Sequence, residues 1–179
     1  AAAVARSVVG DPLADGTTMG PLANAAQFRR VQSLIEQGVA EGAKLVAGGP
    51  GRPQGIERGF FARPTIFSRV SSGMTIAREE IFGPVLSILP YKDEDDAVRI
   101  ANDTEYGLVS YVFTQDLARG IRMIDRLETG MMGLNVGVVS NAAAPFGGLK
   151  QSGVGREGGE KVLGFGGVDM AGRFGVSLL

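Results

Sequence analysis

One short stretch of the sequence combines residue types that could do chemistry. Residues 77–85 read Ala-Arg-Glu-Glu-Ile-Phe-Gly-Pro-Val, with two adjacent carboxylates and an aromatic ring before a Gly-Pro stop. In an extended segment Glu80 and Phe82 would point the same way, because side chains alternate between faces. They would offer an acceptor for hydroxyl groups and a flat apolar face, which a nucleoside could use together. The alternative is that Glu79 and Glu80 are solvated loop charges and Phe82 fills the core.

The composition limits the chemistry available to the chain. Its 179 residues include no cysteine and no histidine, which excludes disulfides, a thiolate nucleophile and the usual zinc or haem ligands. Carboxylates, lysine or tyrosine would have to act as general acids or bases, and we expect no metal.

A net charge of −1 without a basic block argues against a nucleic-acid partner. No apolar run approaches the roughly 20 residues of a membrane span, so we expect a cytoplasmic protein without membrane contact.

Hydrophobic periodicity predicts the elements that position residues 77–85. Apolar residues from Phe28 to Ala40, Val39 among them, recur at three- and four-residue steps and predict a helix with one face on a core. Gly42 is expected to end this helix in a left-handed conformation, and a short strand follows at 44–47. The apolar segment 60–70 contains Pro64, which predicts an edge strand because proline cannot donate to a ladder.

The next segments alternate strands and helices. The apolar run at 85–91 predicts a central strand covered on both faces. Asp93 and Asp116 predict the N-caps of two helices, and runs at 108–114 and 131–136 predict two further strands. The second helix is expected to face inward through Leu117, Ile121, Ile124 and Leu127. This order is typical of an α/β fold with an open, mostly parallel sheet, right-handed crossovers and flanking helices.

A glycine-rich loop, residues 137–159, follows the last predicted strand. Ligands collect at the carboxyl ends of strands in parallel sheets, so a site would be built here. Lys150 and Arg156 are expected to hold the loop by bonding carbonyl groups or by pairing with Glu157. Asn135 at the strand end is interpreted as structural. The chain has no strand-GxGxxG-helix unit and no GxxxxGK[ST] motif, which indicates that a dinucleotide-binding half is not in this chain.

Several separated segments resemble, in order, the NAD(P)-dependent aldehyde dehydrogenases. They read Gly-Asp-Pro-Leu (10–13), Met-Gly-Pro-Leu (19–22), Gly-Phe-Phe-Ala-Arg-Pro-Thr (59–65), Glu-Glu-Ile-Phe-Gly-Pro-Val (79–85), Ala-Asn-Asp-Thr-Glu-Tyr-Gly-Leu (101–108) and Pro-Phe-Gly-Gly-Leu-Lys-Gln-Ser-Gly-Val-Gly-Arg-Glu-Gly-Gly (145–159). Agreement of several segments in order is more specific than a single motif. The resemblance covers residues 8–159 and implies part of a catalytic domain, incomplete relative to the family.

The resemblance implies an activity that this chain cannot perform by itself. In the family, a cysteine thiolate attacks an aldehyde, the hemithioacetal gives hydride to NAD or NADP, and water releases the carboxylic acid. The nucleophile, the general base, the oxyanion-hole asparagine and the dinucleotide fold would all precede residue 1. We therefore expect the C-terminal part of a longer protein, or a processed product, that is inactive alone and contains no catalytic residue.

The resemblance also implies four site residues. Glu80 matches the family glutamate that accepts hydrogen bonds from ribose hydroxyls of the nicotinamide nucleoside, and Phe82 matches the aromatic beside the nicotinamide ring. Residues 137–146 resemble the succinate-semialdehyde dehydrogenase branch, in which a serine at the Ser140 position binds the distal carboxylate of the substrate. Ser140 could instead be a turn residue bonding its own backbone. Phe146 could line the aldehyde tunnel or pack under the loop.

Residues 160–179 depart from the family pattern. Members usually end with a helix and a strand that pairs with a neighbouring subunit, but the glycines of this tail would weaken either element. We expect residues 1–159 to be the domain piece, the tail to be an atypical segment available for oligomerisation, and the protein to be a homo-oligomer. The alternative function is a non-catalytic remnant that acts as an interaction module. A third hypothesis, an isolated nucleotide-binding protein, is poorly supported, because Glu80 would lack a dinucleotide fold to complete its site.

Overall fold

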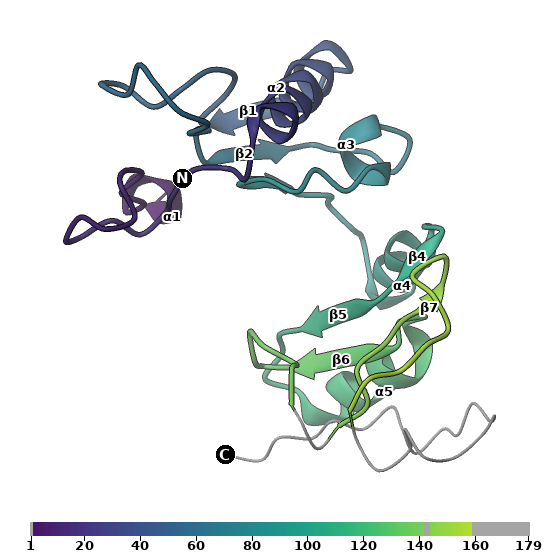
Figure 1. Ribbon diagram of the computed structural model, residues 1–179. Coiled ribbons are helices and arrows are strands. Elements are labelled where there is room, and N and C mark those ends of the chain that lie inside the picture. The colour runs from purple at the N-terminus through teal and green to yellow at the C-terminus, as the bar shows by residue number, and fades with distance from the viewer. Residues whose placement is uncertain (1, 142–143, 159–179) are drawn as a thin grey trace. The chain divides into compact units, whose positions relative to one another are not determined.

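The computed structural model describes residues 2–141 and 144–158, which fall into two compact units, Ala1–Pro90 and Tyr91–Leu179 (Figure 1). Each unit is described by itself. The first contains α1 (Ala2–Ala5), α2 (Ala25–Ala40), β1 (Lys44–Ala47), β2 (Thr65–Ser68), α3 (Thr75–Arg78) and β3 (Val85–Ser87). The second contains α4 (Glu94–Asn102), β4 (Tyr106–Gly107), β5 (Val109–Val112), α5 (Leu117–Arg126), β6 (Met131–Leu134) and β7 (Leu149–Lys150). The tail predicted to serve oligomerisation, residues 160–179, lies outside the described residues.

Helix α2 is the longest element of the first unit and confirms the predicted helix. The Asn24 side chain caps it by accepting a hydrogen bond from the Gln27 amide at 2.9 Å. At the other end Gly42 takes a left-handed φ of 91°. The buried line of the helix passes through Gly38, while Val39 is 47% exposed. The predicted inward position of Val39 is therefore wrong, because a glycine without a side chain contributes nothing to an apolar pattern.

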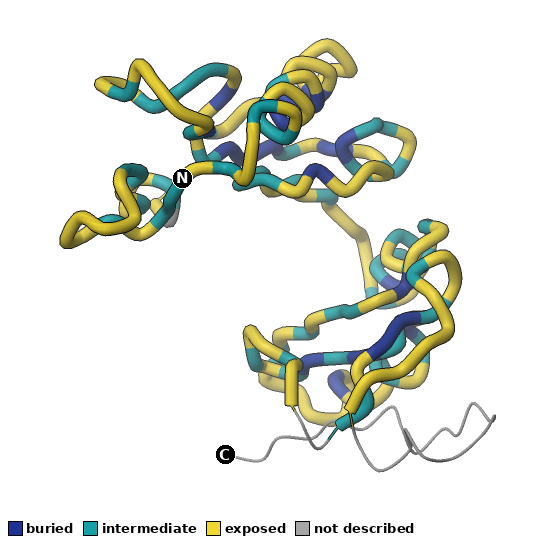
Figure 2. The backbone as a smooth tube through the Cα atoms, viewed as in Figure 1, coloured by how far each residue is buried: buried dark blue, intermediate teal, exposed yellow. Residues whose placement is uncertain are grey.

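The sheet of the first unit has the strand order β1-β2-β3, with β1 antiparallel and β3 parallel to β2. The structure reverses two predictions: β2, the predicted edge segment, is central and buried, and β3, the predicted central strand, lies at the edge (Figure 2). Pro64 precedes the first residue of β2, so the proline removes no donor from the ladder. Leu86 of β3 is 54% exposed, whereas the apolar run in the sequence predicted a strand buried on both faces.

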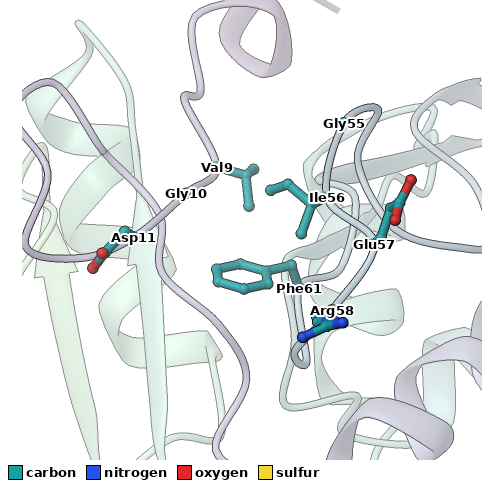
Figure 3. A pocket seen from close by; sticks show the side chains of 8 residues that line it. All are labelled: Val9, Gly10, Asp11, Gly55, Ile56, Glu57, Arg58 and Phe61. Atoms are coloured by element: carbon teal, nitrogen blue, oxygen red, sulfur yellow. The ribbon is translucent and has the colours of Figure 1, made fainter.

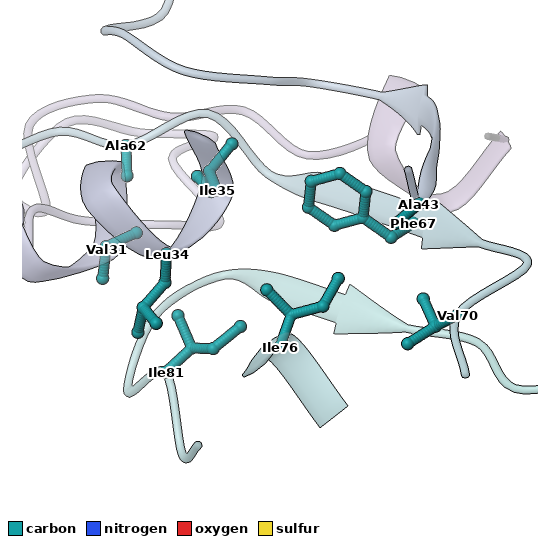
Figure 4. Packing of buried hydrophobic residues seen from close by; sticks show 9 residues of the cluster. All are labelled: Val31, Leu34, Ile35, Ala43, Ala62, Phe67, Val70, Ile76 and Ile81. Carbon is teal, nitrogen blue, oxygen red and sulfur yellow. The ribbon is translucent and has the colours of Figure 1, made fainter. Parts of the chain in front are cut away.

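The core of the first unit forms where α2 and α3 cover the sheet. Val31, Ile35 and Phe67 are completely buried (Figure 4). The cluster also contains Leu34, Ala43, Ala62, Val70, Ile76 and Ile81. Burial of an aliphatic or aromatic side chain of this size contributes about 1.5 to 3 kcal/mol. Helix α3, through Ile76, and the loop after it, through Ile81, therefore pack in the same core as α2.

The second unit confirms the predicted strand–helix–strand order. Strands β5 and β6 are parallel and joined through α5, while β4 and β7 form a separate antiparallel pair. Asp93 and Asp116 cap α4 and α5, accepting hydrogen bonds at 2.9 and 3.1 Å from amides in the first helical turns. The α/β class is thus confirmed. Parallel pairing is seen within each unit, between β2 and β3 in the first and between β5 and β6 in the second.

Helix α5 turns a different face to its sheet than its apolar residues predict. Leu127 is buried as expected, but Leu117 and Ile121 are 67% and 50% exposed. The helix lies against β6 through Gly120, where an added Cβ would stand 2.8 Å from a Leu134 methyl carbon. As at Gly38, the contact depends on a residue without a side chain, and a hydrophobic pattern cannot detect it. None of the helices in the described ranges is long and apolar enough to cross a bilayer.

An ionic cluster joins α4 to α5. Arg122 donates two hydrogen bonds to Glu94, at 3.2 and 3.0 Å. Arg119 and Arg126 each approach the same carboxylate to 3.5 Å. The hydrogen bond from Arg122 lowers the pKa of Glu94 most, and the charges of the three arginines lower it further, while burial opposes them. The folded state therefore favours the ionised form of Glu94.

This cluster predicts a pH dependence of stability. A carboxyl with a lowered pKa contributes stability that is complete above its unfolded pKa, near 4.5, and is lost as the pH falls through the folded value. We expect Glu94→Gln to lower the melting temperature at neutral pH, with a difference that shrinks below about pH 4.5. Thermal unfolding at a series of pH values measures this. The control is Glu105→Gln, because Glu105 forms no ion pair within the described residues; a Glu94 effect independent of pH would contradict the prediction.

Candidate functional site

The Glu-Glu-Ile-Phe stretch forms a loop between α3 and β3, which we call the 79–82 loop. Phe82 has a left-handed φ of 53°. Glu80 and Phe82 are therefore not on one face of an extended segment, and that part of the prediction is wrong. The turn directs the chain into Gly83 and Pro84 ahead of β3. A bulky residue with positive φ costs on the order of 1 to 3 kcal/mol and persists only where neighbours hold it, as is common at functional sites.

Two side chains of α2 hold this loop. The side-chain amide nitrogen of Gln27, Nε2, donates hydrogen bonds to the carbonyl oxygens of Ile81 at 3.0 Å and Phe82 at 2.8 Å. Arg30 forms an ion pair with Glu79 at 3.0 Å and donates to the Glu80 carbonyl at 3.3 Å. The backbone of the loop is therefore bonded to one rigid helix at consecutive residues. This arrangement explains how the strained Phe82 backbone is maintained.

The loop leaves the two predicted side chains accessible. Phe82 is 65% exposed, so the alternative in which it fills the core is excluded. Glu79 and Glu80 are both exposed, but they differ in their partners. Glu79 pairs with Arg30, whereas the Glu80 carboxylate has no hydrogen bond or ion pair with any described residue. An acceptor without a partner and an open aromatic ring, two residues apart on a fixed loop, fit a ligand with hydroxyl groups and a flat ring.

The two predicted substrate residues lie in the second unit. Ser140 is exposed in the segment after β6. Phe146 is 40% exposed, and its backbone exchanges two hydrogen bonds with Glu157, at 2.7 and 2.8 Å. The structure therefore places the cofactor pair in one unit and the substrate pair in the other. The roles of all four residues stay predictions.

The supporting residues of the glycine-rich loop behave as the sequence predicts. Lys150 donates to the carbonyl oxygens of Asn102 and Thr104, at 2.9 and 3.1 Å, and pairs with Glu128 at 2.6 Å. Asn135 bonds both the amide and the carbonyl of Thr114 at 2.8 Å, which confirms its structural role. Arg156 similarly donates to the carbonyls of Val154 and Gly155. Of these contacts, those of Lys150 attach the loop to the rest of its unit.

An open hollow of about 500 Å³ lies elsewhere in the first unit (Figure 3). Val9, Ile56 and Phe61 supply its apolar part, and Asp11, Glu57 and Arg58 bring charges to its rim. It shares no residue with the 79–82 loop. We therefore do not assign the predicted cofactor contacts to this hollow.

Sequence reasoning did not identify Gln27 and Arg30 as parts of the site. A signal existed for Gln27, because Asn24 and Gln27 have the N-cap and N3 spacing of a capping box, in which the N3 side chain bonds back to the cap. In the structure the Gln27 side chain instead reaches the 79–82 loop, more than fifty residues away. The spacing alone offers no indication of that partner.

The two units, each with helices and a parallel strand pair, place the chain in the α/β class. A model described as "Aldehyde dehydrogenase family" matches residues 1–165, and the chain belongs to the aldehyde dehydrogenase family. The predicted family is thus confirmed.

Three relatives illustrate the similarity. A 3-succinoylsemialdehyde-pyridine dehydrogenase of Pseudomonas sp. is 57% identical over 153 residues, 86% of this chain and 32% of the relative. A mutant of aldehyde dehydrogenase C from Pseudomonas syringae, in complex with NAD+ and octanal, is 54% identical with a TM-score of 0.86, covering 89% of this chain and 33% of that structure. A succinate-semialdehyde dehydrogenase from Burkholderia pseudomallei is 44% identical with a TM-score of 0.82, covering 88% and 32%. The chain thus spans about a third of these relatives.

Proposed function

We propose that this chain is the part of an NAD(P)-dependent aldehyde dehydrogenase that binds the nicotinamide nucleoside and borders the aldehyde. The observation that carries the proposal is the 79–82 loop, with an unpartnered Glu80 carboxylate and an exposed Phe82 ring on a backbone bonded to α2. Membership of the family and NAD+ in the Pseudomonas syringae relative support it. The cofactor, when bound, supplies the hydride acceptor.

The residues of this chain would bind and orient the cofactor. An ionised carboxylate is acceptor-only and can take two hydroxyl donors, so Glu80 would hold the ribose. Phe82 would limit the rotation of the nicotinamide ring by stacking or edge contact. The chain has no cysteine, so the thiolate nucleophile must come from polypeptide outside these residues.

The substrate part of the proposal concerns the segment around Ser140. A hydroxyl donor at Ser140 would bind the distal carboxylate of a semialdehyde such as succinate semialdehyde, and Phe146 would border the aldehyde. Two relatives whose names include a semialdehyde support this class, while the complex with octanal shows that a similar protein takes an unbranched aldehyde. The proposed cofactor is NAD or NADP, and the proposed protein is a cytoplasmic homo-oligomer.

A chimaera tests the proposed function. Residues 1–158 would replace the corresponding third of the Pseudomonas syringae enzyme with its catalytic cysteine present. We expect the chimaera to reduce NAD+ with an aldehyde, measured by the absorbance of the reduced cofactor. Comparison of succinate semialdehyde with octanal would test the substrate class, and Ser140→Ala should raise KM for the semialdehyde alone.

The isolated 179-residue chain provides the opposite test. We expect no aldehyde oxidation from it, because no thiolate can form. Turnover by the purified chain would contradict the proposed division of the active site. A folded chimaera that binds neither NAD+ nor aldehyde would favour the alternative, an interaction module without redox chemistry.

A further inference from the structure

The C-terminal end of α2 makes a second set of contacts, with the first residue of α3. Glu41 accepts hydrogen bonds from the amide of Thr75 at 2.7 Å and from its hydroxyl at 2.6 Å. Gln37 donates to the Thr75 hydroxyl at 2.8 Å and to Glu41 at 3.2 Å. Met74, the N-cap residue of α3, forms no side-chain cap bond. Glu41 thus supplies this cap from thirty-four residues away.

The contact matters because α3 is only one turn long. A four-residue helix has almost no stability of its own, since the first turn is the costly step of helix formation. The Glu79 amide closes that turn by donating to the Thr75 carbonyl at 2.8 Å. The 79–82 loop therefore starts at a residue whose position depends directly on Thr75.

Close packing also holds the start of α3 against α2. An added Cβ at Gly38 would stand 2.9 Å from Cδ1 of Ile76, and Ile76 is 4% exposed. Helix α2 thus contacts the segment 75–82 at both of its ends. Glu41 and Gln37 hold its start, and Gln27 and Arg30 hold its end. Only a few residues of the segment lie between the two sets of contacts.

We propose that Glu41 is a positioning residue for the 79–82 loop, and that it aims Glu80 and Phe82 by fixing the start of α3. The functional part of this proposal rests on the proposed function of the loop. Without the Glu41 carboxylate, the Thr75 amide loses its acceptor and the single turn opens. The start of α3 is then held only by Gln37 and by the packing of Ile76 on Gly38, and the directions of the two side chains become variable.

Hydrogen exchange in the isolated 179-residue chain tests the structural step without any activity. We expect Glu41→Ala to accelerate exchange of the Glu79 amide about tenfold, from the loss of a charge-assisted hydrogen bond. Glu41→Gln should retain most of the protection, because its amide oxygen still accepts from Thr75. Glu36→Ala is the matched control, since Glu36 is an exposed carboxylate on the same helix without a partner among the described residues. Unchanged Glu79 exchange in Glu41→Ala would overturn the proposal.

Kinetics of the chimaera test the functional step. We expect Glu41→Ala to raise KM for NAD+ roughly tenfold through misplacement of the loop, with KM for the aldehyde nearly unchanged and Glu41→Gln close to the parent. Faster exchange without a change in KM for NAD+ would overturn the positioning role while leaving the cap intact. If the parent chimaera does not use NAD+, the proposed function fails; the exchange result then still decides whether Glu41 holds the loop.

Discussion

Gly83→Ala is expected to destabilise the first unit by about 1 to 3 kcal/mol, the usual cost of overpacking a core. An added Cβ would stand 2.6 Å from Cγ2 of Val31, well inside contact distance. Val31 is completely buried, and its β-branched side chain has one strongly preferred rotamer in a helix, so it has no room to move aside. The substitution would push the 79–82 loop away from α2. Hydrogen exchange of the buried Val31 and Phe67 amides in the full chain measures the loss.

Two further variants separate the clash from a general effect of replacing glycine. Gly73→Ala is the matched control, because a Cβ added there would have no atom within 4 Å and its backbone is not left-handed. It should change stability by only a few tenths of a kcal/mol. Val31→Ala in the Gly83→Ala background should cost much less than the sum of the single changes, because the clash and the cavity compensate. Additive costs would show that the two residues do not compete for space.

Glu80→Gln in the chimaera is expected to raise KM for NAD+ by the equivalent of about 1 to 3 kcal/mol. This is the cost of weakening a hydrogen bond to a charged group. The neutral amide keeps the shape of the side chain but replaces one acceptor oxygen by a donor. Steady-state kinetics with NAD+ as the varied substrate measures the effect, and the melting temperature should not change, because Glu80 has no side-chain partner among the described residues.

The neighbouring Glu79→Gln is the informative comparison for Glu80. Glu79 carries the same charge one residue earlier, but it forms an exposed ion pair with Arg30. Exposed pairs of this kind contribute at most about 1 kcal/mol, so the change in KM for NAD+ should be small. Equal effects of the two substitutions would show that the cofactor senses the total charge of the loop, and would contradict a specific role for Glu80.

The buried faces of α2 and α5 could not be predicted correctly from the sequence. Periodicity located α2 and α5 and their caps, because capping bonds and apolar spacing act within a few residues. It misplaced Val39, Leu117 and Ile121, because α2 packs against Ile76 at Gly38 and α5 packs against Leu134 at Gly120. Hydrophobicity identifies side chains that avoid water. Close packing of a neighbouring side chain against the helix backbone needs the opposite property, the lack of a side chain at that position.

The sheet shows a related limit. The apolar run of β3 and the proline before β2 led to the reverse of the observed order. Which strand is central depends on pairing partners that are distant in the chain, and short apolar strands are compatible with either place. The antiparallel pairing of β1 with β2 could not be read from either strand alone.

By itself, the sequence determined the family, the α/β class, the absence of a thiol nucleophile and the residues Glu80 and Phe82 as candidates for cofactor binding. These properties depend on residue identity and local spacing. Only the tertiary structure decided that Phe82 takes a left-handed backbone, that Gln27, Arg30 and Glu41 hold the loop, and that Glu79 has a partner while Glu80 has none among the described residues. The physical reason is that hydrogen bonds and packing between residues more than thirty positions apart exist only once the chain has folded.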